Sequence, residues 1–188
     1  MMEFIAGAKK MPEAWFMDNS SDDPRSEHHL NPPEFLTLED VKTLSGVEYW
    51  KIDVDNLEQD HEYSTLRKNR GYDYEDLVEI SKDKLPNYDE KLKVFYTEHL
   101  HADEEIRLFL DGSGYFDVRD KNDRWIRIKA SKGDLLVLPA GIYHRFTLDA
   151  SNYAKVKRLF CGAPVWTAIN RPADDHPARK NYLASVAA

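Results

Sequence analysis

The chain has 188 residues, of which 41% are hydrophobic and 32% charged, a composition typical of one folded domain. Its 26 Lys and Arg against 34 Asp and Glu give a formal net charge of −8, which argues against nonspecific nucleic-acid binding. The single cysteine, Cys161, excludes an internal disulfide framework and a cysteine-rich zinc site. No run of about 18 apolar residues is present, and residues 1–10 lack the pattern of a secretory signal. We therefore expect no membrane insertion and a cytoplasmic location.

The N-terminal part of the chain has few regular patterns. We expect a loose tail over residues 1–13, a single domain over 14–182 and a C-terminal tail over 183–188. The apolar run 14–17 is typical of a short strand. The polar and proline-rich residues that follow it predict irregular structure up to residue 36.

Residues 37–92 are predicted to form the helical part of the domain. Thr37 is a candidate N-cap for a helix with apolar residues at 38, 41 and 44. A second helix is indicated by the spacing of Tyr74, Leu77, Val78 and Ile80.

From residue 93 to about 165 the pattern changes to short apolar or alternating runs separated by turn residues. Their spacing of roughly 8–12 residues predicts an antiparallel sandwich or barrel. Gly112 and Gly114 lie in a turn between two of these runs, so we expect a hairpin there. The expected strands include 94–101, 106–110, 115–118, 125–128, 135–138, 142–148 and 155–160.

The strongest functional signal is a set of three histidines and one glutamate in this β-rich part. His99 and His101 are two residues apart, so a strand would place both on one face, together with Phe95. Glu105 follows closely, and His144 comes after the turn at residues 139–141. Three imidazoles and one carboxylate suit one divalent ion such as iron, nickel, cobalt or manganese. A surface or core histidine pair would give the same His-x-His pattern, but the matching glutamate and distant histidine favour a metal site.

Arg107 is predicted to share a face with Glu105, whereas the alternate positions of that run are plain core. Charged groups that face inward are costly unless they are paired or bind a ligand. Arg107 is therefore a candidate for stabilising negative charge on a substrate, or it simply pairs with a buried carboxylate. Phe95 and Phe146 are candidate pocket walls or core aromatics, and Arg158 is a candidate second cation beside the substrate.

Two other features receive less weight. His28 and His29 lie in a polar stretch, where a solvated pair is favoured over a second metal site. Cys161 has no basic neighbour that would activate a thiol, and we expect it to be a small buried side chain.

The spacing of these residues resembles the two motifs of the cupin superfamily. The first reads His99-x-His101-x3-Glu105-x6-Gly112, and the second reads Gly133-x5-Pro139-x-Gly141-x2-His144. The glycine that often opens the first motif and the asparagine that often closes the second are absent, but neither is a metal ligand. The resemblance implies a cupin-type antiparallel β-barrel, or jelly-roll, that holds one metal ion.

A closer resemblance, from about residue 14 to about residue 182, is to acireductone dioxygenase of the eukaryotic type. It rests on 14–18 (AWFMD), 82–88 (KDKLPNY), 95–101 (FYTEHLH), 111–120 (DGSGYFDVRD), 138–146 (LPAGIYHRF) and 165–172 (VWTAINRP). It implies that the metal ligands are His99, His101, Glu105 and His144. It also implies one Fe²⁺ or Ni²⁺ ion per chain.

The resemblance further implies a role in methionine salvage, with an acireductone, 1,2-dihydroxy-5-(methylthio)pent-1-en-3-one, and O₂ as substrates. With iron the products would be 4-methylthio-2-oxobutanoate and formate. With nickel they would be 3-(methylthio)propanoate, formate and carbon monoxide. The alternatives are a cupin dioxygenase or isomerase for another enediol or diketone, and a non-catalytic metal-binding interaction module. We expect a monomer, and the family resemblance also allows a nuclear location.

Overall fold

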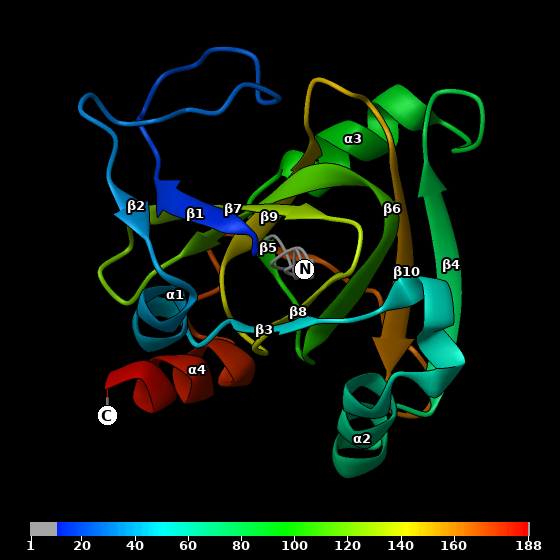
Figure 1. Ribbon diagram of the computed structural model, residues 1–188. Coiled ribbons are helices and arrows are strands. Elements are labelled where there is room, and N and C mark those ends of the chain that lie inside the picture. Colours follow the sequence, from blue (N-terminus) through cyan, green and yellow to red (C-terminus); the bar gives the residue numbers. More distant parts are fainter. Residues whose placement is uncertain (1–10, 188) are drawn as a thin grey trace, which may run out of the picture.

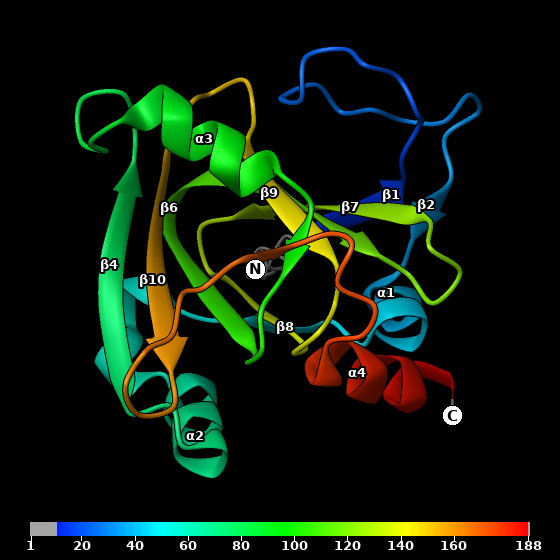
Figure 2. The same cartoon turned by 180° about the vertical axis from the view of Figure 1, so that it is seen from behind.

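The computed structural model describes residues 11–187, and its strands form one mainly antiparallel hydrogen-bonded system (Figures 1 and 2). The strands are β1 (Glu13–Phe16), β2 (Phe35–Leu36), β3 (Glu48–Lys51), β4 (Tyr74–Ile80), β5 (His99–Leu100), β6 (Glu105–Arg119), β7 (Trp125–Ser131), β8 (Asp134–Leu138), β9 (His144–Leu148), β10 (Ala154–Phe160) and β11 (Ile169–Asn170). The helices are α1 (Leu38–Ser45), the 3₁₀ helix η1 (Val54–Gln59), α2 (His61–Arg70), α3 (Tyr88–Tyr96) and α4 (Pro177–Ala187).

Strand β6 joins the two halves of the sheet. Its first half pairs with β8 and β10, and its second half pairs with β7 and β9. The paths β3-β8-β6-β10-β4 and β11-β5-β9-β6-β7-β1-β2 therefore share one strand and curl around a common core (Figure 1). Phe109 and Phe116, which lie in the two halves of β6, are both buried in that core.

The predicted hairpin at Gly112 and Gly114 is wrong, because β6 continues through both residues. Gly112 has a φ of 68° and lies opposite Ala154, at the end of the pairing with β10. From Ser113 onward the strand pairs with β7 instead. The glycine therefore marks a change of pairing partner within one strand and not a reversal of the chain.

The helical prediction is correct for α1 and wrong for residues 74–80. Thr37 caps α1 through a reciprocal capping box with Asp40. Residues 74–80 form β4, an edge strand paired along its whole length with β10. The acidic residues of β4 face cations of β10, as in the Glu75–Lys157 pair. These cross-strand pairs stabilise a strand, and they are invisible to a spacing argument made on one segment.

Two predictions near the chain ends also need correction. The C-terminal tail is wrong for residues 183–187, because α4 runs to Ala187 and lies beside α1 in both views (Figures 1 and 2). Tyr182 is buried in this contact and donates a hydrogen bond to the Ser45 carbonyl at 2.8 Å. The N-terminal tail lies outside the described residues except for 11–13, of which Glu13 already belongs to β1. No helix among residues 11–187 is long and apolar enough to cross a membrane.

The strand predicted over 94–101 is wrong for most of its length. Helix α3 extends to Tyr96, and only His99 and Leu100 are extended as β5. Phe95 therefore lies on a helix and does not share a strand face with His99. Lys91 and Phe95 are four residues apart in α3 and therefore lie on the same side of the helix. Both line the cavity described below.

Candidate metal centre

The structure brings His99, His101, Glu105 and His144 together at one end of the barrel. Their nearest ligand atoms all lie within 4.8 Å of one another. His99 on β5 pairs directly with His144 on β9, and Glu105 is the first residue of β6. His99, Glu105 and His144 are all at least nine-tenths buried. Their chemistry is therefore shielded from bulk water, although they come from separate parts of the chain.

Each histidine ring is oriented by a backbone carbonyl that accepts a hydrogen bond from its Nδ1. His99 donates to Thr97 at 2.6 Å, His101 donates to Thr167 at 2.7 Å, and His144 donates to Ile142 at 2.9 Å. A neutral ring that donates from Nδ1 carries its lone pair on Nε2. The three rings thus present their electron-pair donors to one shared space, which is the arrangement seen around metal-binding histidines.

The donor set fits a cation. Glu105 Oε2 lies 3.0 Å from Nε2 of His101 and 3.2 Å from Nε2 of His144. A carboxylate oxygen and imidazole lone pairs are all acceptors, so they face one another favourably only with a proton or a metal ion between them. Nitrogen and oxygen donors in this ratio suit one divalent transition-metal ion.

The charge states agree with this fit. Burial, with the neighbouring His144, lowers the pKa of His99 to about 4, so that ring is neutral at pH 7. Burial would raise the pKa of Glu105, but the charge of Arg107 and the two histidines hold it well below its usual value. Burial would lower the pKa of His101, but the hydrogen bond and charge of Glu105 raise it. A buried carboxylate therefore keeps its negative charge beside a neutral imidazole.

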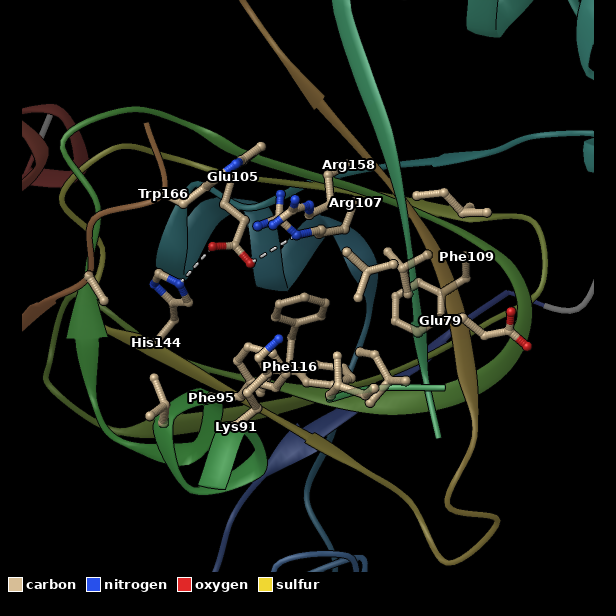
Figure 3. Close-up of a pocket in the computed structure, with 18 of the residues that line it drawn as sticks. Glu79, Lys91, Phe95, Glu105, Arg107, Phe109, Phe116, His144, Arg158 and Trp166 are labelled. Atoms are coloured by element: carbon tan, nitrogen blue, oxygen red, sulfur yellow. Dashed lines mark hydrogen bonds and ion pairs between the residues drawn. The ribbon is translucent and has the colours of Figure 1, made fainter. Parts of the chain in front are cut away.

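Two arginines lie beside the four donors (Figure 3). Arg107 Nε is 3.5 Å from Glu105 Oε1, and its Nη1 donates to the Ile106 carbonyl at 3.0 Å. Arg158 is held more firmly, because Asp76 accepts two of its hydrogen bonds, at 2.7 and 2.5 Å. Arg107 thus keeps guanidinium N–H groups that Glu105 does not occupy, whereas those of Arg158 are largely hydrogen-bonded to Asp76.

A cavity of about 770 Å³ opens from these donors, and all eight candidate site residues line it. Its walls are mainly apolar, with Phe95 and Phe146 in edge-to-face contact at 6.3 Å between ring centres. Phe95 reaches the cavity from α3 and Phe146 from β9, so each is positioned by a different element. The volume is within the range of small-molecule sites, and the four metal-ligand candidates and two arginines lie in a mainly apolar lining.

Sequence reasoning missed part of this site. Trp166 lies under both arginines, with its ring centre 4.1 Å from the guanidinium carbon of Arg158 and 5.4 Å from that of Arg107. The segment that carries Trp166 and Thr167 runs from the end of β10 across to β5 (Figure 2). The only sequence signal for Trp166 is an aromatic residue in an otherwise irregular stretch. A contact between separate segments produces no periodic pattern in the local sequence.

Two other predictions are wrong. The His28–His29 pair is not solvated: His28 is 7% exposed, with Nδ1 2.9 Å from Asp18 and Nε2 2.9 Å from the Asp23 carbonyl. Cys161 is exposed and its thiol donates to the Arg70 carbonyl, so it is not a buried apolar side chain. Among residues 11–187, only the four donors above form a group of three or more potential metal ligands.

Comparison with known proteins explains the arrangement. The model of the ARD/ARD' family matches residues 13–168. The chain belongs to this family. It is 60% identical to the acireductone dioxygenase of Ixodes scapularis over 94% of this chain and 97% of the relative. It is 59% identical to that of Gallus gallus over 94% and 98%, and 61% identical to acireductone dioxygenase 4 of Arabidopsis thaliana over 91% of both chains.

A solved structure supports the fold. The acireductone dioxygenase from Bacillus anthracis with a cadmium ion in its active center superposes with a TM-score of 0.66. That match has 22% sequence identity and covers 86% of this chain and 99% of that chain. The predicted mainly β, cupin-type architecture and the predicted family are both confirmed.

Proposed function

We propose that the chain is an acireductone dioxygenase that cleaves 1,2-dihydroxy-5-(methylthio)pent-1-en-3-one with O₂. The observation that carries the proposal is the buried group of three imidazoles and one carboxylate in the lining of a mainly apolar cavity. Family membership, with relatives that share about three-fifths of their residues with this chain, supports the same substrate.

The metal would be held by His99, His101, Glu105 and His144. We propose Fe²⁺ or Ni²⁺, one ion per chain, because both accept mixed nitrogen and oxygen donors. The bound ion supplies Lewis acidity and a template for the two vicinal oxygens of the substrate. The cadmium-containing relative supports a single divalent ion at this place in the fold.

The residues around the metal centre have separable tasks. Arg107 is placed to stabilise negative charge on the enediolate, because its guanidinium lines the cavity next to Glu105. Trp166 lies against the guanidinium groups of Arg107 and Arg158 and limits their movement. Phe95 and Phe146 form an apolar wall for the methylthio tail and exclude water from the reacting carbons.

The products depend on the metal under this proposal. The iron form gives 4-methylthio-2-oxobutanoate and formate, and the nickel form gives 3-(methylthio)propanoate, formate and carbon monoxide. Both sets account for every atom of the acireductone and of one O₂ molecule. The ketoacid product returns carbon to methionine salvage.

The test is reconstitution of metal-free protein with Fe²⁺ or Ni²⁺, followed by oxygen-uptake and product assays. We expect formate with both metals, the ketoacid with iron and carbon monoxide with nickel. A desthio acireductone serves as a second substrate that keeps the reacting group. Absence of oxygen uptake with both metals and both substrates would refute the proposal and favour another enediol substrate or a non-catalytic role.

A further inference from the structure

The cavity is layered along its length by the register of β6, β10 and β4. One row holds Arg107, Arg158 and Asp76, which pair across the three strands next to the metal centre. The next row away from the metal centre holds Phe109, Val156 and Val78, and the row after that ends at Ala154 and Ile80. Successive rows on one face are two residues apart, and a strand rises about 3.3 Å per residue. The third row therefore lies about 13 Å from the charged row.

The cavity lining also carries a second set of charges, outside the row of Arg107 and Arg158. The loop after β4 brings Lys84 to the lining, and α3 brings Lys91, which lies one helical turn before Phe95 (Figure 3). Leu85 and Pro86 line the same cavity. The cavity lining thus carries cationic groups from β6 and β10, and further ones from α3 and the loop after β4, among mainly apolar residues.

These two lysines differ from the arginines of the metal end. Arg158 is paired with Asp76 and Arg107 contacts Glu105, but neither Lys84 nor Lys91 has an ion pair or side-chain hydrogen bond within residues 11–187. Glu79, which also lines the cavity, accepts from the Tyr153 hydroxyl at 3.4 Å. Unpaired ammonium groups beside an apolar wall are ready to bind an anion, even on a chain of net charge −8.

A methylthio tail does not need these cations. The methylthio acireductone has about ten non-hydrogen atoms, which a chamber of about 770 Å³ accommodates with space to spare. Its tail is uncharged and ends in the apolar middle when the enediolate lies at the charged row. The part of the lining that carries Lys84 and Lys91 is therefore left for a longer group of different chemistry.

We propose that Lys84 and Lys91 form an anion subsite that admits acireductones whose longer tail ends in a carboxylate. This inference rests on the proposed function, because it extends the substrate range of the same site. The cleavage at the metal end is unchanged, and the tail carboxylate takes no part in it. Binding energy comes from the lysines, which contact the substrate far from the reacting carbons.

The experiment compares three substrates: the methylthio acireductone, an analogue with a longer tail ending in a carboxylate, and the methyl ester of that analogue. The readouts are kcat/KM and anaerobic calorimetric affinity, since binding without O₂ proceeds without turnover. We expect the carboxylate to be preferred over its ester by about fivefold or more, the size of a partly exposed ion pair. That ratio should fall toward one in Lys91→Met and in Lys84→Met.

Lys93→Met is the matched control, because Lys93 is exposed on the same helix and does not line the cavity. Lys93→Met removes the same charge as Lys91→Met but should leave the preference for carboxylate over ester unchanged. Lys91→Arg keeps the positive charge and should retain that preference. An equal ratio in the wild type, or an equal loss in Lys93→Met, overturns the subsite. Normal turnover of the methylthio substrate in either case leaves the proposed function standing, whereas its absence refutes that function instead.

Discussion

At the scale of single residues, the metal centre is determined by hydrogen bonds that fix three imidazole rings. Each Nδ1 donates a hydrogen bond to the backbone carbonyl of a residue that is not itself a candidate metal ligand. The rings are therefore oriented before any ion binds, and the conformational entropy lost on binding is small. Glu105 supplies the only negative charge among the four side chains.

Glu105→Gln should weaken metal binding by more than about a hundredfold, because an amide is neutral and cannot balance the charge of the ion. Elemental analysis of purified protein and calorimetric titration with Ni²⁺ measure the effect. Asp103→Asn, an exposed change two residues away, serves as the control and should leave affinity unchanged. Retention of stoichiometric metal by Glu105→Gln would remove this carboxylate from the proposed ligand set.

Arg107→Met should lower kcat/KM by about a hundredfold, or about 2.7 kcal/mol, with the metal content unchanged. The reason is the loss of a buried positive charge next to the enediolate, while the apolar volume is largely kept. Lys157→Met is a suitable comparison, because Lys157 lies next to Arg158 on β10 but pairs with Glu75 outside the cavity. An effect of less than about threefold for Arg107→Met would contradict the role proposed for it.

At the scale of elements, β6 organises both the sheet and the site. It begins at Glu105, carries Arg107 and Phe109 into the cavity, and then changes partners at Gly112. The Cβ atom of any other residue at position 112 would lie 2.2 Å from the Tyr153 carbonyl oxygen. The two chain segments are therefore in direct backbone contact. The close approach of Gly112 to Tyr153, at the point where β6 changes pairing partners, therefore depends on the absence of a side chain.

Gly112→Ala should destabilise the protein by more than about 3 kcal/mol, because the backbone conformation and the contact with Tyr153 both oppose a Cβ. Gly162→Ala separates the two causes. Gly162 has the same φ of 68° but nothing within 4 Å of its Cβ position, so we expect a cost of only about 1 kcal/mol. Urea unfolding measures both variants, and equal costs would show that the contact with Tyr153 is unimportant.

The sequence predicted the elements whose signal is local and failed where pairing decides the outcome. The capping box of α1, the alternation within β7 and β9 and the continuous apolar run of β8 are local signals, so the sequence predicts these elements. The spacing of apolar residues in β4 indicates a helix, but the residues that stabilise it as a strand lie on β10. For the site, the four candidate metal ligands have recognisable spacing, whereas Trp166 contacts Arg107 from a distant segment of the chain.

At the scale of the whole molecule, the metal centre links segments that are far apart in the chain. Its donors come from β5, the following loop, β6 and β9, and Thr167 orients one of them. An ion bound there would cross-link these segments in the folded state only. Metal binding should therefore contribute to global stability by mass action.

Removal of the metal by a chelator should lower the thermal midpoint by about 5–10 °C when free metal had been at about a hundred times its Kd. The effect should return on addition of Ni²⁺ and grow with its concentration. Differential scanning calorimetry of wild type and Glu105→Gln measures it. A chelator effect of the same size in Glu105→Gln would show that the stabilising ion binds somewhere else.

The hydrogen bond between the His101 ring and the Thr167 carbonyl has a consequence for biosynthesis. Residues 99–105 leave the ribosome long before Thr167 and before His144, so an emerging chain holds an incomplete set of oriented rings. Early capture of an ion by His99 and His101 alone would thus be weak and reversible. Selection of the resident ion belongs to the completed polypeptide, after its last third has been synthesised and has docked against β5.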